Sequence, residues 1–431
     1  MKTMSRMTLV CMSLIAFLAL SGQAFSTTVA VGSCSTLINF ATIQQAVNAV
    51  PPGSTIRICP GNYHEQVVIS EKLTLEGVVY AGTDAVVILP PTSGAVANTS
   101  DLDDPSLPIA AQILVQNTDG PVLISNLTVD GTGNGITGCA PDLDGILFQN
   151  SSGTINHVAV RNQTLSAGLG GCQSGEGIYV QTGTGLASNV IIENNSVHNY
   201  NKNGITGNDA GTKLTVTGNY VQGSGVVASG GAAQNGIQLA FGATGKISSN
   251  TVTDNIYGDI TLAASADILL FDTQENSAVT VSSNVLGSSQ IPIGLFTDTA
   301  GVGDGIAVTG NKIFGTSSFD AIDVCTNKNT IKSNAIFNSA ESGIHLDASC
   351  GNTGNDNVAT SNTIVESSCA GVLSDLTTDG NTITPNTYET VPFTTATSTS
   401  KCTIPAGPMS ARVTRNVSGR STSKMKVQPA R

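Results

Sequence analysis

Two short motifs alternate along most of the sequence. The first is a Gly followed by Ile, as in Gly145-Ile146, Gly177-Ile178 and Gly343-Ile344. With the degenerate copies that begin at Asp259, Gly294, Ala321 and Gly371, it recurs every 22 to 35 residues. The second is an Asn followed closely by a β-branched or aliphatic residue, and its members are Asn126, Asn156, Asn195, Asn219, Asn250, Asn284, Asn311, Asn334, Asn362 and Asn381. A repeat of this period indicates a chain built from stacked units rather than around one central core.

Short runs of Val, Ile and Thr lie between these motifs and are bounded by Gly, Asn, Asp and Ser, a pattern that predicts strands joined by turns. No helical pattern separates the strands, which excludes a doubly wound α/β sheet. We therefore predict an all-β fold, a right-handed parallel β-helix of about 11 coils with three strands each. The Ile of each Gly-Ile motif points inward and stacks on its equivalent one coil away. Asn tolerates left-handed backbone at a turn, so the second motif predicts a structural ladder of stacked Asn side chains.

The two ends of the chain differ from the repeat. Residues 1–24 carry an early positive charge, a short apolar run and a small-residue cleavage pattern, which predicts a signal peptide. Residues 42–50 have helical apolar spacing and stop at Pro51-Pro52, so a short helix should cap the N-terminal end of the β-helix domain, 25–402. Residues 403–431 are basic and lack apolar periodicity, which predicts a disordered tail.

Eight cysteines remain after the signal peptide, an even number that is typical of disulfides in an exported protein. Their spacing does not suggest zinc. Coil spacing predicts the pairs Cys34–Cys59, Cys139–Cys172, Cys325–Cys350 and Cys369–Cys402. With no later apolar stretch long enough to span a bilayer, we expect a secreted or periplasmic monomer.

Charge is distributed unevenly. Residues 57–389 contain nine basic and all thirty acidic residues, a net charge of −21, whereas the chain from Lys401 onward has seven basic residues and no acidic ones. The acidic body argues against nucleic acid as a partner. It also argues against a strongly anionic polymer unless a divalent cation bridges the two.

The segments Thr42-Ile43-Gln44-Gln45-Ala46-Val47, Gly61-Asn62-Tyr63-His64-Glu65 and Leu73-Thr74-Leu75-Glu76-Gly77 resemble the opening of pectin methylesterases and of other pectin-lyase-like β-helix proteins. With the downstream repeat, the resemblance covers about residues 34–390. It implies a β-helix scaffold and a polysaccharide partner. The catalytic motifs of methylesterases, polygalacturonases and alginate epimerases are absent, so the resemblance transfers no catalytic residue.

Strand alternation, applied from the inward Ile, places Asp323 and His345 side by side on the outer face of adjacent coils. Asp347 lies beside them and Phe296 one coil back. A carboxylate beside an imidazole suits acid/base chemistry, so we predict Asp323, His345 and Asp347 as catalytic residues. The competing interpretation is a solvated surface ion pair.

A second outer row predicts a metal site and a sugar site. Asp298, Asp347 and Asp375 could hold Ca²⁺, or could serve only as solubilising charges, and no cofactor is required by any motif. Tyr179, Gln149 and Gln181 should border a groove walled by the loops of Cys139 and Cys172, with Gln238 and Phe296 as further substrate contacts. The alternative is that this disulfide only restrains two long loops. Asp144 and Glu176 occupy a position that other coils fill with Asn or Asp, so we interpret them as turn caps.

Two functions follow from these patterns. The first is a polysaccharide-cleaving enzyme that acts by hydrolysis or β-elimination through the acid/base pair. The second is a non-catalytic β-helix that binds carbohydrate, a cell surface or metal.

Overall fold

The computed structural model describes residues 25–79, 85–166, 168–169, 171–227, 232–258, 263–274, 279–299, 302–316, 318–350 and 353–397. The expected signal peptide, the basic tail and Cys402 lie outside these ranges.

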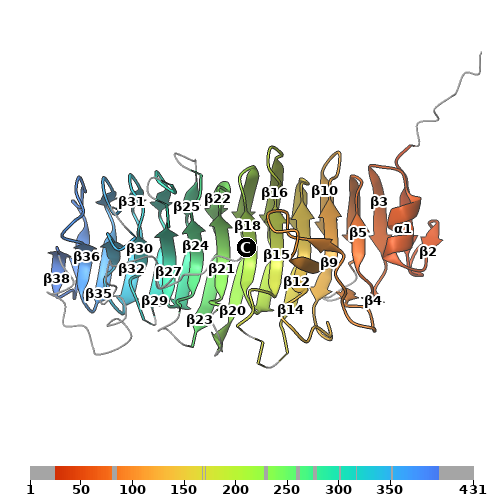
Figure 1. The fold of residues 1–431 in the computed structure, drawn as a ribbon, viewed down its shortest axis with the longest axis horizontal. Coiled ribbons are helices and arrows are strands. Elements are labelled where there is room, and N and C mark those ends of the chain that lie inside the picture. The colour runs from red at the N-terminus through yellow and green to blue at the C-terminus, as the bar shows by residue number, and fades with distance from the viewer. Residues whose placement is uncertain are drawn as a thin grey trace, which may run out of the picture.

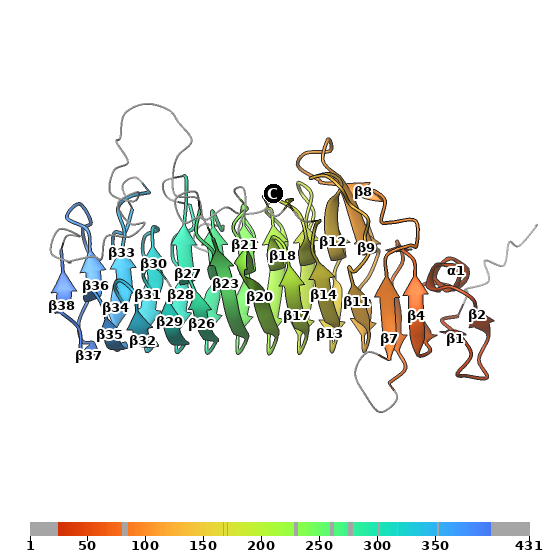
Figure 2. The ribbon, with the colours of Figure 1, turned by 90° about the horizontal axis from the view of Figure 1, so that it is seen from below.

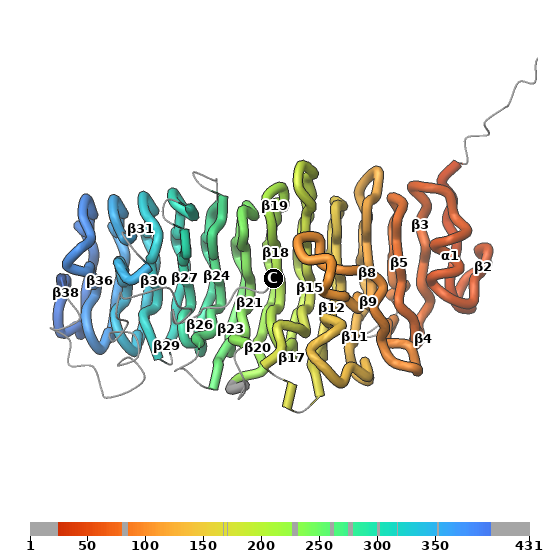
Figure 3. Tube along the Cα trace, in the orientation of Figure 1, coloured from red at the N-terminus to blue at the C-terminus, as the bar shows by residue number. Residues whose placement is uncertain are grey.

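The described chain winds into an elongated stack of coils (Figure 1). Each coil contributes one strand in turn to sheets A, B and C, and neighbouring coils pair in parallel. Eleven successive coils of the described residues, beginning at β3, β6, β10, β13, β16, β19, β22, β25, β28, β31 and β34, supply all three sheets. The trace in Figure 3 shows these coils one behind another along a single axis. The prediction of a parallel β-helix of about 11 coils is confirmed.

Sheet A consists of β1 (Thr28–Val31), β2 (Asn39–Phe40), β3 (Ser54–Ile58), β6 (Leu73–Gly77), β10 (Val122–Ser125), β13 (Gly153–Asn156), β16 (Ser188–Glu193), β19 (Thr212–Thr217), β22 (Thr244–Ser248), β25 (Thr280–Ser282), β28 (Ala307–Thr309), β31 (Thr330–Lys332) and β34 (Val358–Thr360). Sheet B consists of β4 (Gly61–His64), β7 (Val86–Leu89), β11 (Thr128–Asp130), β14 (Ala159–Gln163), β17 (Ser196–Tyr200), β20 (Tyr220–Val227), β23 (Thr251–Tyr257), β26 (Val285–Ser289), β29 (Lys312–Thr316), β32 (Ala335–Ser339), β35 (Thr363–Ser367) and β37 (Thr387–Glu389). Sheet C consists of β5 (Val67–Ile69), β9 (Pro108–Gln116), β12 (Asp142–Gln149), β15 (Glu176–Gln181), β18 (Asn203–Asn208), β21 (Asn235–Ala240), β24 (Ala266–Phe271), β27 (Ile291–Phe296), β30 (Ile322–Val324), β33 (Ile344–Leu346), β36 (Ala370–Ser374) and β38 (Phe393–Ala396), with β8 (Thr99–Ser100) antiparallel to β9.

One continuous apolar core fills the inside of the coils. Ile146, Ile178, Ile205 and Ile237 are fully buried and directly paired from coil to coil, as the Gly-Ile motif predicts. Because each coil covers the next, burial repeats along the axis and every internal strand depends on both of its neighbours.

The Gly before each inward Ile marks a close approach of backbones. A Cβ on Gly145 would lie 2.6 Å from the carbonyl oxygen of Gly177 and 2.6 Å from Cγ1 of the core residue Val160. This Gly therefore faces the interior, as does the Ile that follows it, and strict in–out alternation fails at this corner. The residue before the Gly consequently joins the outer face of sheet C, which strict alternation did not predict.

A ladder of Asn side chains lies along the turns that connect the strands of sheet A to those of sheet B. In each step, the Nδ2 and the backbone N of one Asn donate to Oδ1 of the Asn in the next coil, at 2.8–3.0 Å. Its members are Asn195, Asn219, Asn250, Asn284, Asn311, Asn334, Asn362 and Asn386. The predicted ladder is confirmed from Asn195 to Asn362. Asn386 takes the last step in place of Asn381, which belongs to a second, shorter ladder with Asn329 and Asn357. The predicted members Asn126 and Asn156 do not take part, and the backbone N of Val158 donates to Asn195 instead.

The N-terminal end is capped as predicted. Helix α1 (Ile43–Ala49) begins after Thr42, whose hydroxyl accepts from the backbone N of Gln45, and the Glu65 carboxylate accepts from the N–H groups of Ile43 and Gln44. Figure 2 shows α1 at the end of the stack. Three predicted disulfides are present, Cys34–Cys59, Cys139–Cys172 and Cys325–Cys350. Cys369 is also disulfide-bonded, but its predicted partner Cys402 is not described.

We predict that Asn284→Ala destabilises the protein by several kcal/mol. The substitution leaves the backbone N of Asn250 and the carbonyl of Ile247 without their side-chain partner, and each buried unpaired group costs about 1–3 kcal/mol. It also removes one of the two hydrogen bonds that Nδ2 of Asn250 donates. Chemical denaturation measures the effect, and Asn189→Ala at an exposed position of sheet A is the control. Equal stability of the two variants would show that the ladder carries no net stabilisation.

Candidate functional site

The outer face of sheet C carries three rows of side chains. The row before the Gly includes Ala111, Asp144, Glu176, Asn203, Asn235, Ala266 and Ile291. The middle row is Leu114, Leu147, Tyr179, Thr206, Gln238, Leu269, Gly294, Asp323, His345 and Leu373. The third row includes Gln116, Gln149, Gln181, Asn208, Ala240, Phe271 and Phe296. Most of these side chains are buried, so the competing interpretation of Asp323 and His345 as a solvated surface ion pair is wrong.

The coil register differs from the prediction in one region. Gly294, not Phe296, pairs with Asp323, so Phe296 falls in the third row beside Phe271. Phe296 there packs against a small apolar cluster with Leu269 and Ile291. Asp298 is also out of its predicted register. The Gly-Ile repeat is degenerate around residues 259–294, so the predicted alignment of the coils is wrong there.

His345 lies at the centre of a buried carboxylate cluster. Its Nδ1 is 3.0 Å from Oδ2 of Asp320 and its Nε2 is 3.1 Å from Oδ1 of Asp375. Asp323 is its direct register neighbour, as predicted, and is fully buried. Asp320 was not predicted as a site residue, because its position, which precedes the Gly in other coils, was interpreted as a turn cap.

The electrostatics of this cluster hold a proton on His345. Burial alone would lower the imidazole pKa, but Asp320 and then Asp347 raise it well above its usual value. Burial likewise acts to raise the pKa of Asp375, and the hydrogen bond and charge of His345 lower it overall. His345 is therefore a charged imidazolium with both N–H groups engaged. It is poorly suited to act as a general base, although it can stabilise negative charge.

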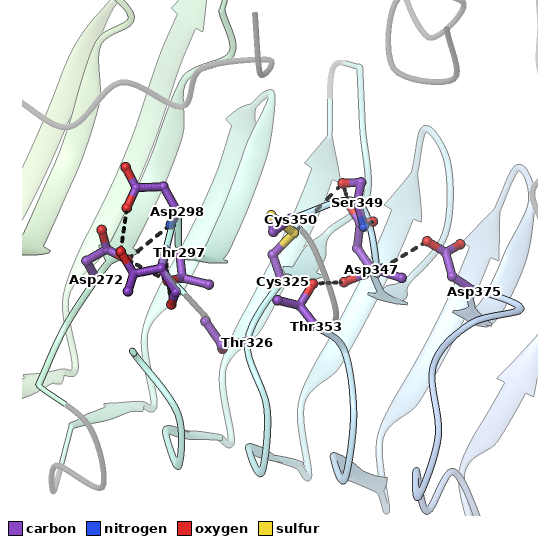
Figure 4. The surroundings of a disulfide bond; sticks show 12 residues. Asp272, Thr297, Asp298, Cys325, Thr326, Asp347, Ser349, Cys350, Thr353 and Asp375 are labelled. Atoms are coloured by element: carbon purple, nitrogen blue, oxygen red, sulfur yellow. Dashed lines mark hydrogen bonds between the residues drawn. A yellow bond between two sulfur atoms is a disulfide. The ribbon is translucent and has the colours of Figure 1, made fainter. Parts of the chain in front are cut away.

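The predicted metal ligands separate into two places, on either side of the Cys325–Cys350 disulfide (Figure 4). His345, Asp347 and Asp375 bring one ligand atom each within 4.8 Å of one another, as do Asp320, Asp323 and His345. Asp347 is already bound by the backbone N and the hydroxyl of Ser349, at 2.6 and 2.8 Å.

Asp298 lies apart from this group, beside Asp272. Its backbone N donates to Oδ1 of Asp272 at 3.1 Å, and the Thr297 hydroxyl donates to the same oxygen. Burial, with Asp298 as a neighbour, raises the pKa of Asp272 to about 6. The structure therefore does not bring Asp298 together with Asp347 and Asp375 as a ligand set.

A second acidic cluster lies nearer the N-terminal end of sheet C. Asp144 and Glu176 are direct neighbours on β12 and β15, and their exposed fractions are 0% and 1%. Neither oxygen of either carboxyl group makes a hydrogen bond of ordinary geometry, although the Thr206 hydroxyl is close enough to act on Glu176. Their interpretation as turn caps is wrong, since they lie within strands and cap nothing.

Burial and mutual repulsion raise the pKa values of this cluster. Burial comes first for Asp144, followed by the charges of Asp142 and Glu176, and holds its pKa well above the usual value. Burial and then the charge of Asp142 raise the pKa of Glu176 to about 8, although the Thr206 hydroxyl and the charge of Lys202 act to lower it. The partly buried Asp142, whose carboxyl group is enclosed, has its pKa raised to about 7. Burial lowers the pKa of Lys202 to about 7, with Glu176 opposing the shift.

A loop crosses sheet C beside this pair, over β9, β12 and β15 (Figures 1 and 3). Gln149 donates to the carbonyl of Ser100 at 2.8 Å and accepts from the Thr99 hydroxyl at 2.7 Å. Gln181 donates to Oδ2 of Asp101 at 2.9 Å. These two glutamines hold the loop, and Asp101 is buried.

The other predicted sugar contacts are also internally bonded. The Tyr179 hydroxyl accepts from Nδ2 of Asn208 at 3.3 Å, and its ring packs in an apolar cluster with Leu147. Gln238 accepts from Asn203 and donates to Asn208, both at 3.1 Å. The structure thus gathers Tyr179, Gln149 and Gln181 around the acidic pair, with Gln238 beside them.

Comparison with known proteins decides the handedness of the coil. The family described as a right handed beta helix region matches residues 144–312. The chain is a right-handed parallel β-helix. The pectin-methylesterase-like opening lies outside the matched residues. A search of the curated proteins finds no significant match.

Solved structures that share this fold include the two that follow. The GH136 lacto-N-biosidase from Eubacterium ramulus is 11% identical, with a TM-score of 0.56 over 86% of this chain and 68% of that one. The catalytic domain of a GH87 α-1,3-glucanase, solved with nigerose, is 15% identical, with a TM-score of 0.55 over 86% and 68%. At these identities the likeness establishes the fold and nothing finer. Within the described residues, no helix has the length and apolarity needed to cross a membrane.

We predict that His345→Asn destabilises the protein most at acidic to neutral pH. Because the folded-state pKa is raised, the stabilisation by His345 is fully present below its unfolded value of about 6.5 and declines as pH rises through the folded value. Breaking a buried ion pair costs about 3–5 kcal/mol. Denaturation at several pH values measures the difference, and a difference that does not shrink in alkali would contradict a charged His345.

Proposed function

We propose that the protein is an exported, carbohydrate-active β-helix enzyme that hydrolyses a glycosidic bond on the outer face of sheet C, with Asp144 and Glu176 as its carboxyl pair. The observation that carries the proposal is a pair of adjacent buried carboxyl groups without hydrogen-bond partners and with raised pKa values. Glycoside hydrolysis needs two carboxyl groups in different protonation states. The glycosidase neighbours and the three disulfides support a carbohydrate-active protein outside the cytosol.

The surroundings assign different roles to the two carboxyl groups. Lys202 lowers the pKa of Glu176, whereas the charges acting on Asp144 are those of other carboxylates. Glu176 is therefore the first of the pair to ionise and serves as base or nucleophile. Asp144 keeps its proton and donates it to the leaving oxygen.

The Asp323–His345–Asp347 group remains a second candidate centre, with one observation in its favour. An imidazolium held between carboxylates supplies a fixed positive charge within an acidic region. Such a charge could stabilise a developing oxyanion, and bound Ca²⁺ at His345, Asp347 and Asp375 could do the same. β-Elimination needs a general base, which a charged His345 does not provide.

We predict that Asp144→Asn and Glu176→Gln each lower kcat/KM for polysaccharide cleavage by a factor on the order of 10²–10⁴. The amides keep the shape of the side chains and remove the transferable proton or the negative charge. Reducing-end release across a panel of glycans measures activity, and the exposed Asp119→Asn is the matched control.

Cleavage by wild type that persists in both variants and disappears in His345→Asn would move the centre to the second candidate. Binding of a glycan without any cleavage would support the non-catalytic alternative.

The pH profile tests the role of Lys202. Activity of the wild type should rise as pH increases through about 8, because Glu176 must lose its proton to act. The ionised forms of Glu176 and Lys202 stabilise each other, so Lys202→Met, which removes the ammonium group, should move the rising limb to higher pH. An unchanged limb in the variant would contradict electrostatic coupling between Lys202 and Glu176.

A further inference from the structure

The cluster around Asp144 is rich in acceptors and poor in donors. Among the described residues, its buried carboxyl oxygens without a partner are Asp142 Oδ1, Asp144 Oδ1 and Oδ2, Glu176 Oε1 and Oε2, and Asp209 Oδ2. Buried polar atoms of folded proteins almost always have a partner, and an unpaired one costs about 1–3 kcal/mol. A ligand that donates several hydrogen bonds would satisfy these oxygens.

The acidic surroundings of the cluster limit which ligands can bind there. Asp101 and Asp103 add to the repulsion, and burial with Asp103 raises the pKa of Asp209 to about 7. The cation that acts on Glu176 is Lys202, whose Nζ donates to the carbonyl of Ala233 at 2.7 Å. A uronate would bring another carboxylate into this environment and is disfavoured.

A metal ion is a poor fit to this cluster. Among the described residues, potential ligand atoms within 4.8 Å of one another are found in the groups that contain His345, not around Asp144 and Glu176. A positive ligand for Asp144 and Glu176 should therefore bring its own hydrogen-bond donors rather than rely on close convergence of carboxylates.

We propose that the glycan recognised at this site carries free amino groups, and that one sugar ammonium donates hydrogen bonds to the carboxyl oxygens of Asp144 and Glu176 and favours ionisation of these carboxyl groups when it binds. This inference rests on the proposed function, because it names the substrate class of the same site. An ammonium group offers three N–H donors and a compensating charge. An N-acetyl group offers one N–H, adds a carbonyl acceptor and carries no charge. The net charge of −12 also favours the approach of a cationic polymer.

The test compares two oligosaccharides that differ only in N-acetylation, a glucosamine oligomer and the N-acetylglucosamine oligomer of the same length. Calorimetry with the full chain at pH 6 should give at least tenfold tighter binding of the amino oligomer. That affinity should fall with added salt, whereas the affinity for the acetylated oligomer should not.

Glu176→Gln and Asp144→Asn should reduce the preference toward parity, and Asp119→Asn should retain it. The preference is a ratio of two affinities within each variant, so partial loss of folded protein does not imitate the expected result.

Equal or tighter binding of the acetylated oligomer by wild type would overturn the inference, and so would a preference that survives in both variants. Cleavage of a neutral glycan without any amino preference would overturn this inference and leave the hydrolase intact. A carboxyl-dependent amino preference without cleavage of any glycan would overturn the hydrolase and leave the binding site.

Discussion

The close approach of backbones at the Gly of each Gly-Ile motif determines what sheet C presents outward. A Cβ on Gly145 or Gly177 would collide with the next coil and with a core Val, so Gly and Ile both turn inward. The residue before the Gly is thereby brought to the outer face beside the residue three positions later. Asp144 and Glu176 reach the outer face by this corner, and in the coil of Asp320 the inward position of the Gly is taken by the buried Ala321.

The two clusters solve the problem of buried charge differently. Around His345, carboxylates are paired with an imidazolium and with backbone N–H groups, and Asp320, Asp347 and Asp375 all have bonded oxygens. Around Asp144, the oxygens stay unpaired and the pKa values rise instead. An arrangement of this kind is destabilising by itself, and the Asn ladder and stacked core hold the strands that carry it.

The fold was predictable because its signals repeat. Each Gly-Ile copy and each ladder Asn reports the same local geometry, and the coil spacing also placed the pairs Cys139–Cys172 and Cys325–Cys350 correctly. The predicted register is wrong where the repeat is degenerate. Asp267 occupies the interior position that Gly occupies in other coils, and Phe296 lies two residues away from its predicted position.

The site was harder to predict, although Asp323 and His345 were correctly paired. Strict alternation hides the row that contains Asp144 and Glu176, and no local pattern announces that Gln149 and Gln181 hold a distant loop. The collision of a Cβ at the repeated Gly was the signal that could have revealed this row, because it implies two consecutive inward residues.

The carboxyl group of Glu176 on sheet C should keep its proton at neutral pH, because burial raises its pKa to about 8. The most direct test is an NMR titration of protein labelled with ¹³C at the Glu side-chain carboxyl, compared with Glu176→Gln. We predict one Glu resonance that titrates near pH 8 in the wild type and is missing in the variant. Titration of every Glu near its ordinary value of about 4.3 would contradict the account.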